Sequence, residues 1–136
     1  MLEIIANLSI ASLLILTNIF IHAYGLSIIS KFRDEYLSNK HSAFNIGIVV
    51  IGILFLHTVE VWEWALFYFA SELLPNFETA LYYSTTTYTT LGYGDVLLNP
   101  NNRLIGALQS AIGILLFGWS AAYIFDSLSH ITQKRK

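Results

Sequence analysis

The stretch TTTYTTLGYGD, residues 85–95, lies between two long apolar segments and differs from both. Within it are seven hydroxyl-bearing side chains, two glycines and one aspartate. In a water-soluble protein such a polar stretch would form a surface hairpin. At membrane depth, irregular backbone is tolerated only where protein buries it or where it lines an aqueous cavity. How this stretch folds therefore depends on whether the chain lies in water or in lipid.

The composition indicates a membrane protein. The chain has 136 residues, of which 55% are hydrophobic and 12% are charged, and its mean hydropathy is +0.59. Charged residues make up about a quarter of an average soluble domain, so this chain has half the usual share. It contains no cysteine, which excludes disulfides and Cys-based metal sites. The net charge of −2 and the lack of a basic patch give no indication of nucleic acid binding, and nothing indicates a small-molecule substrate.

Three segments are long enough to cross a bilayer, which takes about 20 apolar residues. They cover residues 4–29, 43–70 and 103–128. The first is uncharged, and its main polar residues are Asn7, Asn18 and His22. It lacks the basic start of a secretory signal and is longer than the apolar part of one, so we expect it to stay as a membrane span.

The basic residues predict the orientation. Six of the seven Lys and Arg lie either between the first two spans or at the C-terminus. An even number of crossings separates these two regions, and cytoplasmic loops carry the excess of Lys and Arg. We therefore expect a polar cytoplasmic turn at residues 31–42, a cytoplasmic C-terminus and an external N-terminus. The aromatic residues near the end of the second span are expected at the outer membrane interface; they are Trp62, Trp64 and Tyr68.

A short helix is predicted between the second and third spans, over residues 76–89. Asn76 follows a proline and is a suitable N-cap, and Glu78 would lie favourably in the first turn. This helix is too short to cross a bilayer, and a glycine-containing stretch follows it directly. A half-helix followed by an irregular return predicts a re-entrant loop on the external side.

The sequence Thr90-Leu91-Gly92-Tyr93-Gly94 resembles the selectivity filter of potassium channels of the pore-loop superfamily, with Leu91 where the family usually has valine. The resemblance extends over residues 43–128, the two-span core of bacterial-type channels. An aromatic pair precedes the filter, Asp95 follows it, Arg103 opens the third span and a glycine lies ten residues further on. The first span is extra to this architecture.

This resemblance implies that the backbone carbonyls of the filter, residues 90–95, hold potassium ions. The ion ligands would be the carbonyls of Thr90, Leu91, Gly92 and Tyr93 together with the Thr90 hydroxyl. Gly92 and Gly94 would adopt backbone conformations that strain other residues, and the side chains of Leu91 and Tyr93 would pack behind the filter. The residues expected to support the filter are Tyr82, Tyr83, Thr86 and Asp95. Thr86 stands where some members have a glutamate that bonds to the outer aspartate.

One pore loop per chain, with no internal repeat, predicts a homotetramer, because a ring of carbonyls needs four such loops. The resemblance therefore implies an all-helical, multi-pass protein of the plasma membrane, surrounded by lipids, which conducts ions passively and is not an enzyme. Three alternatives remain open: a channel for both sodium and potassium, a transporter, and a structural membrane partner. A transporter would show inverted repeats, which are absent, and no span carries the repeated arginines of a voltage sensor.

Further candidates lie on the second and third spans. A stripe at helical spacing is predicted to line the inner cavity, with helix or lipid packing as the alternative; it comprises Ile114, Phe117, Ala121 and Ile124. Gly113 and Gly118 are candidates either for a hinge or for a close-packing contact. His57 and Glu60 share one face of the second span, either as a pH-sensing pair or as a structural hydrogen bond to a neighbouring helix.

Overall fold

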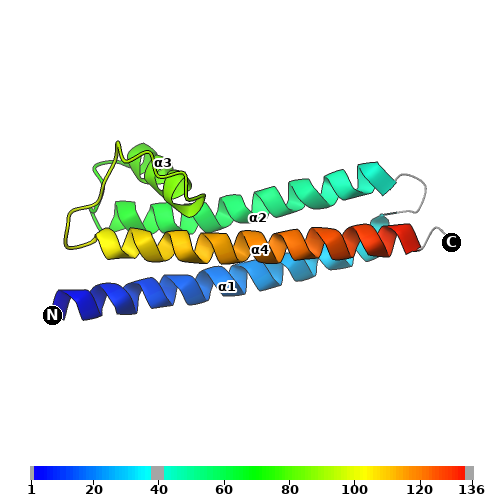
Figure 1. Ribbon diagram of the computed structural model, residues 1–136, viewed down its shortest axis with the longest axis horizontal. Coiled ribbons are helices and arrows are strands. Elements are labelled where there is room, and N and C mark those ends of the chain that lie inside the picture. Colours follow the sequence, from blue (N-terminus) through cyan, green and yellow to red (C-terminus); the bar gives the residue numbers. More distant parts are fainter. Residues whose placement is uncertain (1, 38–41, 134–136) are drawn as a thin grey trace.

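The computed structural model describes residues 2–37 and 42–133, and these form four α-helices with no strand. In chain order they are α1 (Leu2–Tyr36), α2 (Ser42–Ala70), α3 (Phe77–Tyr88) and α4 (Arg103–Gln133). The three long helices lie side by side in a bundle, and the short α3 packs at one end of it beside α2 and α4 (Figure 1). The fold is therefore all-helical, as the sequence predicts.

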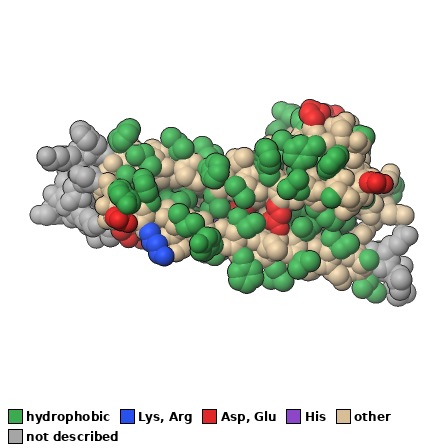
Figure 2. Space-filling model, turned by 180° about the vertical axis from the view of Figure 1, so that it is seen from behind, with side chains coloured by type: hydrophobic (Ala, Val, Ile, Leu, Met, Phe, Trp, Pro, Cys, Tyr) green, Lys and Arg blue, Asp and Glu red, His purple; other side chains and the backbone are tan. Residues whose placement is uncertain are grey.

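Three of these helices are long and apolar enough to cross a membrane, over Ile4–Tyr36, Phe44–Ala70 and Arg103–Ser129. A helix suits lipid because it satisfies its own backbone hydrogen bonds. Polar side chains on α1 are satisfied in the same way: the Ser9 and Ser12 hydroxyls donate to the carbonyls of Ile5 and Leu8, at 2.9 and 2.7 Å. On the face shown in Figure 2, hydrophobic side chains cover the bundle along its length, and basic and acidic side chains lie side by side near the end away from α3.

The main core forms where α3 meets α2 and α4, and two aromatic residues expected at the membrane interface lie inside it. Trp64 and Tyr68 have no exposed surface, whereas Trp62 is 47% exposed and faces outward. The interface prediction is therefore wrong for Trp64 and Tyr68. They are one helical turn apart on the inner face of α2, and their polar atoms find partners there: Trp64 donates to Asn18 and Tyr68 donates to Gln109.

The expected polar turn at residues 31–42 is also wrong for residues 31–36, because α1 continues to Tyr36. Arg33 is only 7% exposed, and its guanidinium donates to Asp126 at 3.3 Å and to Ser127 at 2.9 Å. Because α4 supplies these partners, the charged end of α1 stays helical and pairs with α4. Residues 38–41 of the expected turn lie outside the described residues. At the other end of the chain, α4 reaches Gln133, five residues beyond the predicted span.

Candidate functional site

The short helix α3 begins as the sequence predicts. The Asn76 side chain accepts a hydrogen bond from the Thr79 amide at 2.8 Å, which caps the helix, and Glu78 lies in the first turn. The helix has 12 residues, which gives a length of about 18 Å and falls short of the roughly 30 Å of a bilayer core. The chain after α3 then returns to α4 at the same end of the bundle, so α3 and this return form a re-entrant loop (Figure 1).

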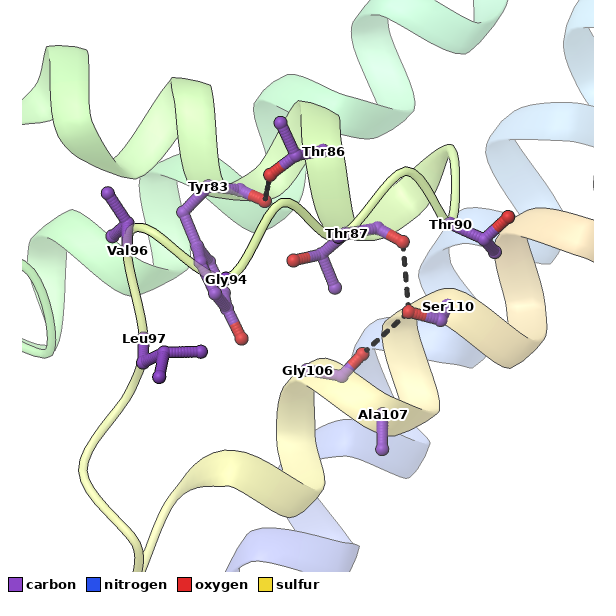
Figure 3. Close-up of a pocket in the computed structure, with 11 residues that line it drawn as sticks. Tyr83, Thr86, Thr87, Thr90, Gly94, Val96, Leu97, Gly106, Ala107 and Ser110 are labelled. Atoms are coloured by element: carbon purple, nitrogen blue, oxygen red, sulfur yellow. Dashed lines mark hydrogen bonds between the residues drawn. The ribbon is translucent and has the colours of Figure 1, made fainter.

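Polar contacts from both neighbouring spans hold α3 in place. The Ser84 hydroxyl donates to the Val61 carbonyl of α2 at 2.7 Å, and the Gln109 amide of α4 donates to the Ser84 oxygen at 2.8 Å. Ser110, also on α4, donates to the Thr87 carbonyl at 2.9 Å (Figure 3). Because buried polar groups must be paired, these bonds fix the position of α3 and of the loop that follows it.

The backbone after α3 alternates in handedness. Thr90, Gly92 and Gly94 have positive φ angles of 60°, 52° and 79°, whereas Leu91 and Tyr93 between them are not among the positive-φ residues. In an extended strand, successive carbonyls point to opposite sides, but a positive φ at every second residue turns successive backbone groups toward a common side. The glycines adopt this conformation with little strain. Thr90 does not, because a positive φ is unusual for a β-branched residue.

Two backbone hydrogen bonds attach this strained segment to α3. The Thr90 amide donates to the Thr87 carbonyl and the Gly92 amide donates to the Thr86 carbonyl, each at 3.0 Å. These bonds keep both amides occupied on the side of α3. The amides of Thr90 and Gly92 therefore anchor the segment to α3, and these bonds do not use the carbonyls of the segment.

The two faces of the segment have different surroundings. Thr90, Gly92 and Gly94 border a cavity of about 260 Å³ between the segment, α3 and α4 (Figure 3). Leu91 and Tyr93, which alternate with them, are 54% and 68% exposed. A single chain therefore does not cover these two side chains, and their packing behind the filter stays a prediction.

Of the predicted support residues, Tyr82 contacts Asp95 directly. Its hydroxyl donates to the Asp95 carboxylate at 2.7 Å, and this bond raises the pKa of Tyr82 because it holds the phenol proton. The Thr86 hydroxyl instead donates within its own helix, to the carbonyls of Tyr82 and Tyr83 at 3.1 Å. Tyr82 thus supplies a partner for Asp95 in a chain that lacks the family's glutamate at position 86. Tyr83 is buried and packs edge-on against Tyr68, with ring centroids 5.1 Å apart.

The two candidate hinge glycines of α4, Gly113 and Gly118, have different surroundings. A Cβ added to Gly113 would overlap the backbone carbonyl of Tyr88, the last residue of α3, so glycine here permits a close helix contact. An added Cβ on Gly118 meets no atom within 4 Å. The close-packing alternative therefore describes Gly113 in this structure, and a hinge role stays a prediction for both residues.

The predicted cavity-lining stripe is not uniform in a single chain. Ile114 is 59% exposed and Ala121 is also exposed, as a pore-lining face would be before assembly. Phe117 is 38% exposed, but its ring lies 4.5 Å from the ring of His57. Ile124 packs against a small core cluster between α1 and α2. Pore lining therefore stays a prediction for this stripe.

His57 and Glu60 lie together in the structure, in a larger buried network. The His57 Nδ1 is 2.9 Å from one Glu60 carboxylate oxygen, and the Tyr88 hydroxyl donates to that oxygen at 2.5 Å. The other carboxylate oxygen is 2.7 Å from the Nδ1 of His22, on α1. The sequence alone did not predict His22 as a partner of Glu60. Its spacing does indicate a buried face, because Asn18 and His22 are one turn apart and share one face of the first span.

A membrane bundle with one re-entrant half-helix, followed by a backbone segment of alternating handedness, defines a pore-loop type of membrane protein. Over residues 54–130 the chain matches the family model described as "Ion channel", which covers more than half of its length. The protein belongs to this family of ion channels with a two-span core. The match begins within α2 and ends in α4, so α1 lies outside it. Comparisons with curated proteins and with solved structures gave no match.

Proposed function

We propose that the protein is a potassium-selective channel of the plasma membrane, in which residues 90–94 of each subunit form one wall of the ion path. The observation that carries this proposal is the alternation of positive φ at Thr90, Gly92 and Gly94. This backbone form gives consecutive carbonyls a common direction, which suits the replacement of the water shell of a dehydrated potassium ion. The chain supplies the ion ligands mainly from its backbone, with the Thr90 hydroxyl as the one side-chain ligand.

The attachment of this segment supports selectivity. A carbonyl ring can discriminate between ions only when its position and ligand number are controlled. Here the amides of Thr90 and Gly92 bond to α3, and Tyr82 bonds to Asp95 at the outer end. Both ends of the segment are therefore tied to one helix, which α2 and α4 hold in turn.

Exposed residues support a tetramer. Leu91 and Tyr93 are more than half exposed, and Ile114 on α4 is 59% exposed, although all three are apolar or aromatic. Neighbouring subunits around a fourfold axis would cover such surfaces, and four pore loops would complete the ring of carbonyls. Permeation through this ring is passive, so the proposed protein catalyses no reaction.

The experiment that tests this function uses purified protein in liposomes loaded with potassium chloride. Potassium efflux is recorded by dye quenching coupled to a protonophore, and a final addition of valinomycin gives the total vesicle capacity. Sodium-loaded liposomes measure selectivity, external barium tests block, and protein-free liposomes are the control. We expect fast, barium-sensitive potassium efflux and little sodium efflux.

Each alternative predicts a different result. Equal potassium and sodium fluxes would indicate a non-selective channel and overturn the selectivity. Saturable flux that depends on a second solute would indicate a transporter, and no flux at all would leave a structural role. Native mass spectrometry on the same preparation measures assembly, and a mass other than four times 15.3 kDa would overturn the tetramer.

A further inference from the structure

Three ionisable side chains meet in the interior of the bundle, where α1 and α2 pass the end of α3. They are His22 on α1 with His57 and Glu60 on α2, and each offers one ligand atom within 4.8 Å of the others. His22 and Glu60 have no exposed surface, and the His57 side chain is 8% exposed. Ionisable groups inside a membrane are costly, so a buried group of three calls for a specific stabilising interaction.

The two histidine rings are oriented in the same way. Both Nδ1 atoms face the Glu60 carboxylate, at 2.7 Å from His22 and 2.9 Å from His57. Both Nε2 atoms face the Ser120 hydroxyl on α4, at 2.9 Å from His57 and a longer 3.5 Å from His22. A hydroxyl oxygen has two lone pairs and can accept from both rings. In that tautomer, the Nδ1 lone pairs of both rings converge on the Glu60 carboxylate, which is the arrangement that a bound cation stabilises.

The donor set fits a transition metal of the zinc type. Zinc binds histidine nitrogen and carboxylate oxygen with four ligands, whereas calcium and magnesium prefer oxygen alone. The Tyr88 hydroxyl lies 3.0 Å from the His57 Nδ1 and 2.5 Å from Glu60, at the position of a fourth ligand or of a bound water. Ser120 provides the partner that metal-bound histidines usually have on their other nitrogen.

We propose that His22, His57 and Glu60 bind one zinc-type metal ion, with Ser120 positioning both histidine rings. Bonds of about 2.0–2.2 Å put tetrahedral ligand atoms roughly 3.4 Å apart, so metal entry opens the present contacts by about half an ångström. A ring that carries its proton on Nδ1 must change to the tautomer with the proton on Nε2 when the metal binds. The Nε2–H then donates a hydrogen bond to the Ser120 hydroxyl. A second carboxylate, Glu63, lies one turn further along α2 and accepts hydrogen bonds from Thr17 and Asn18.

This site joins three helices. His22 belongs to the span outside the family match, the other two ligands belong to α2, and Tyr88 is the last residue of α3, two positions before the proposed filter. A bound metal would therefore tie α1 to the base of the re-entrant loop. The site does not depend on ion conduction, so its test does not require a conducting protein.

The test uses the full chain, purified in detergent without a histidine tag and treated with a chelator. Cobalt is titrated as a spectroscopic probe, zinc is then added in competition, and retained zinc per chain is measured by elemental analysis after dialysis. We expect about one metal per chain and the visible absorption of four-coordinate cobalt, lost on addition of zinc. If the wild-type chain retains no zinc after loading and dialysis and gives no such cobalt absorption, the proposal is overturned without any variant.

Variants locate the site. His22→Gln and His57→Gln are expected to weaken zinc binding more than about 100-fold, and Ser120→Ala by about 10–100-fold, because outer partners contribute less than ligands. The matched control removes the other two histidines together, as His41→Gln with His130→Gln, and should leave binding unchanged. Unchanged binding in the His22 and His57 variants, or lost binding in the control, would place the metal elsewhere and overturn the proposal.

Discussion

Thr90 and Gly92 have nearly the same positive φ, 60° and 52°, but this conformation costs them different amounts of free energy. Glycine accepts positive φ without strain, whereas an L-residue with a Cβ is strained by roughly 1–2 kcal/mol. The bond from the Thr90 amide to the Thr87 carbonyl helps to hold Thr90 in the strained form, and its side chain brings a hydroxyl to the base of the segment. Strain at a position that also carries a ligand atom is typical of functional sites.

Gly92 gives the first residue-scale prediction. No atom lies within 4 Å of a Cβ added there, so Gly92→Ala changes the backbone preference without a clash inside the chain. The cost of about 1–2 kcal/mol for positive φ falls on every subunit, and we expect potassium flux in liposomes to drop about tenfold or more. Gly47→Ala is the matched control, because Gly47 is also open but lies within α2 with ordinary helical backbone. Equal potassium flux and selectivity in both variants would refute the filter assignment.

At the scale of helices, α3 and α4 approach each other most closely through backbone at Gly113. The backbone carbonyl of Tyr88 occupies the space beside Gly113, and Ser110 holds the Thr87 carbonyl one turn away on α4. Backbone cannot move aside as a flexible side chain can, so any larger residue at 113 must separate the two helices. The end of α3 lies two residues before the proposed filter.

We therefore predict that Gly113→Ala lowers stability by about 1–3 kcal/mol, the usual cost of overpacking, and shifts the filter base. The measurement is thermal unfolding in detergent together with potassium flux. Gly118→Ala on the same helix is the control and should keep wild-type stability, because its added Cβ meets no neighbour. A hinge at Gly113 without a packing role would give the opposite pattern, with stability unchanged and only the opening of the channel altered.

The helices could be predicted from the sequence because length, apolar content and capping are local properties. Asn76 caps α3 as predicted, and α2 begins and ends within one residue of the expected bounds. The contacts between helices could not be predicted in this way. Trp64 looked like an interface residue because nothing in its own segment shows that Asn18 on another helix accepts its N–H. The same holds for Arg33, whose partners on α4 lie more than ninety residues away.

In the candidate site, too, local features could be predicted from the sequence and contacts between helices could not. The candidate filter residues could be proposed because their order in the chain resembles a known motif, and Gly92 and Gly94 have the positive φ angles expected of them. His22 is recognisable in the sequence as a polar residue of the first span. Its partner could not be predicted, because Glu60 lies on a different helix and only the fold brings the two together. A network built from α1, α2, α3 and α4 leaves no short pattern in the sequence.

At the scale of the whole molecule, α1 is bound along its full length although it lies outside the family match. Asn7 donates to the Asn101 carbonyl near one end, His22 meets Glu60 midway, and Arg33 pairs with Asp126 near the other end. Polar contacts between membrane helices contribute about 0.6 kcal/mol each on average, so several of them together fix the register of a helix. The extra span is therefore part of the bundle and has a defined height relative to the proposed filter.

This arrangement makes the orientation of the protein a testable property of the whole molecule. The chain contains no cysteine, so the unmodified protein is its own unlabelled control. Asn99, after the re-entrant loop, and Glu35, near the end of α1, are both exposed and lie at opposite ends of the bundle. We predict that a membrane-impermeant maleimide labels Asn99→Cys but not Glu35→Cys in intact cells, because an excess of Lys and Arg is typical of cytoplasmic loops. After lysis both variants should be labelled, which shows that both thiols are reactive. Labelling of Glu35→Cys alone in intact cells would reverse the orientation and place the Asp95 end of the ion path on the cytoplasmic side.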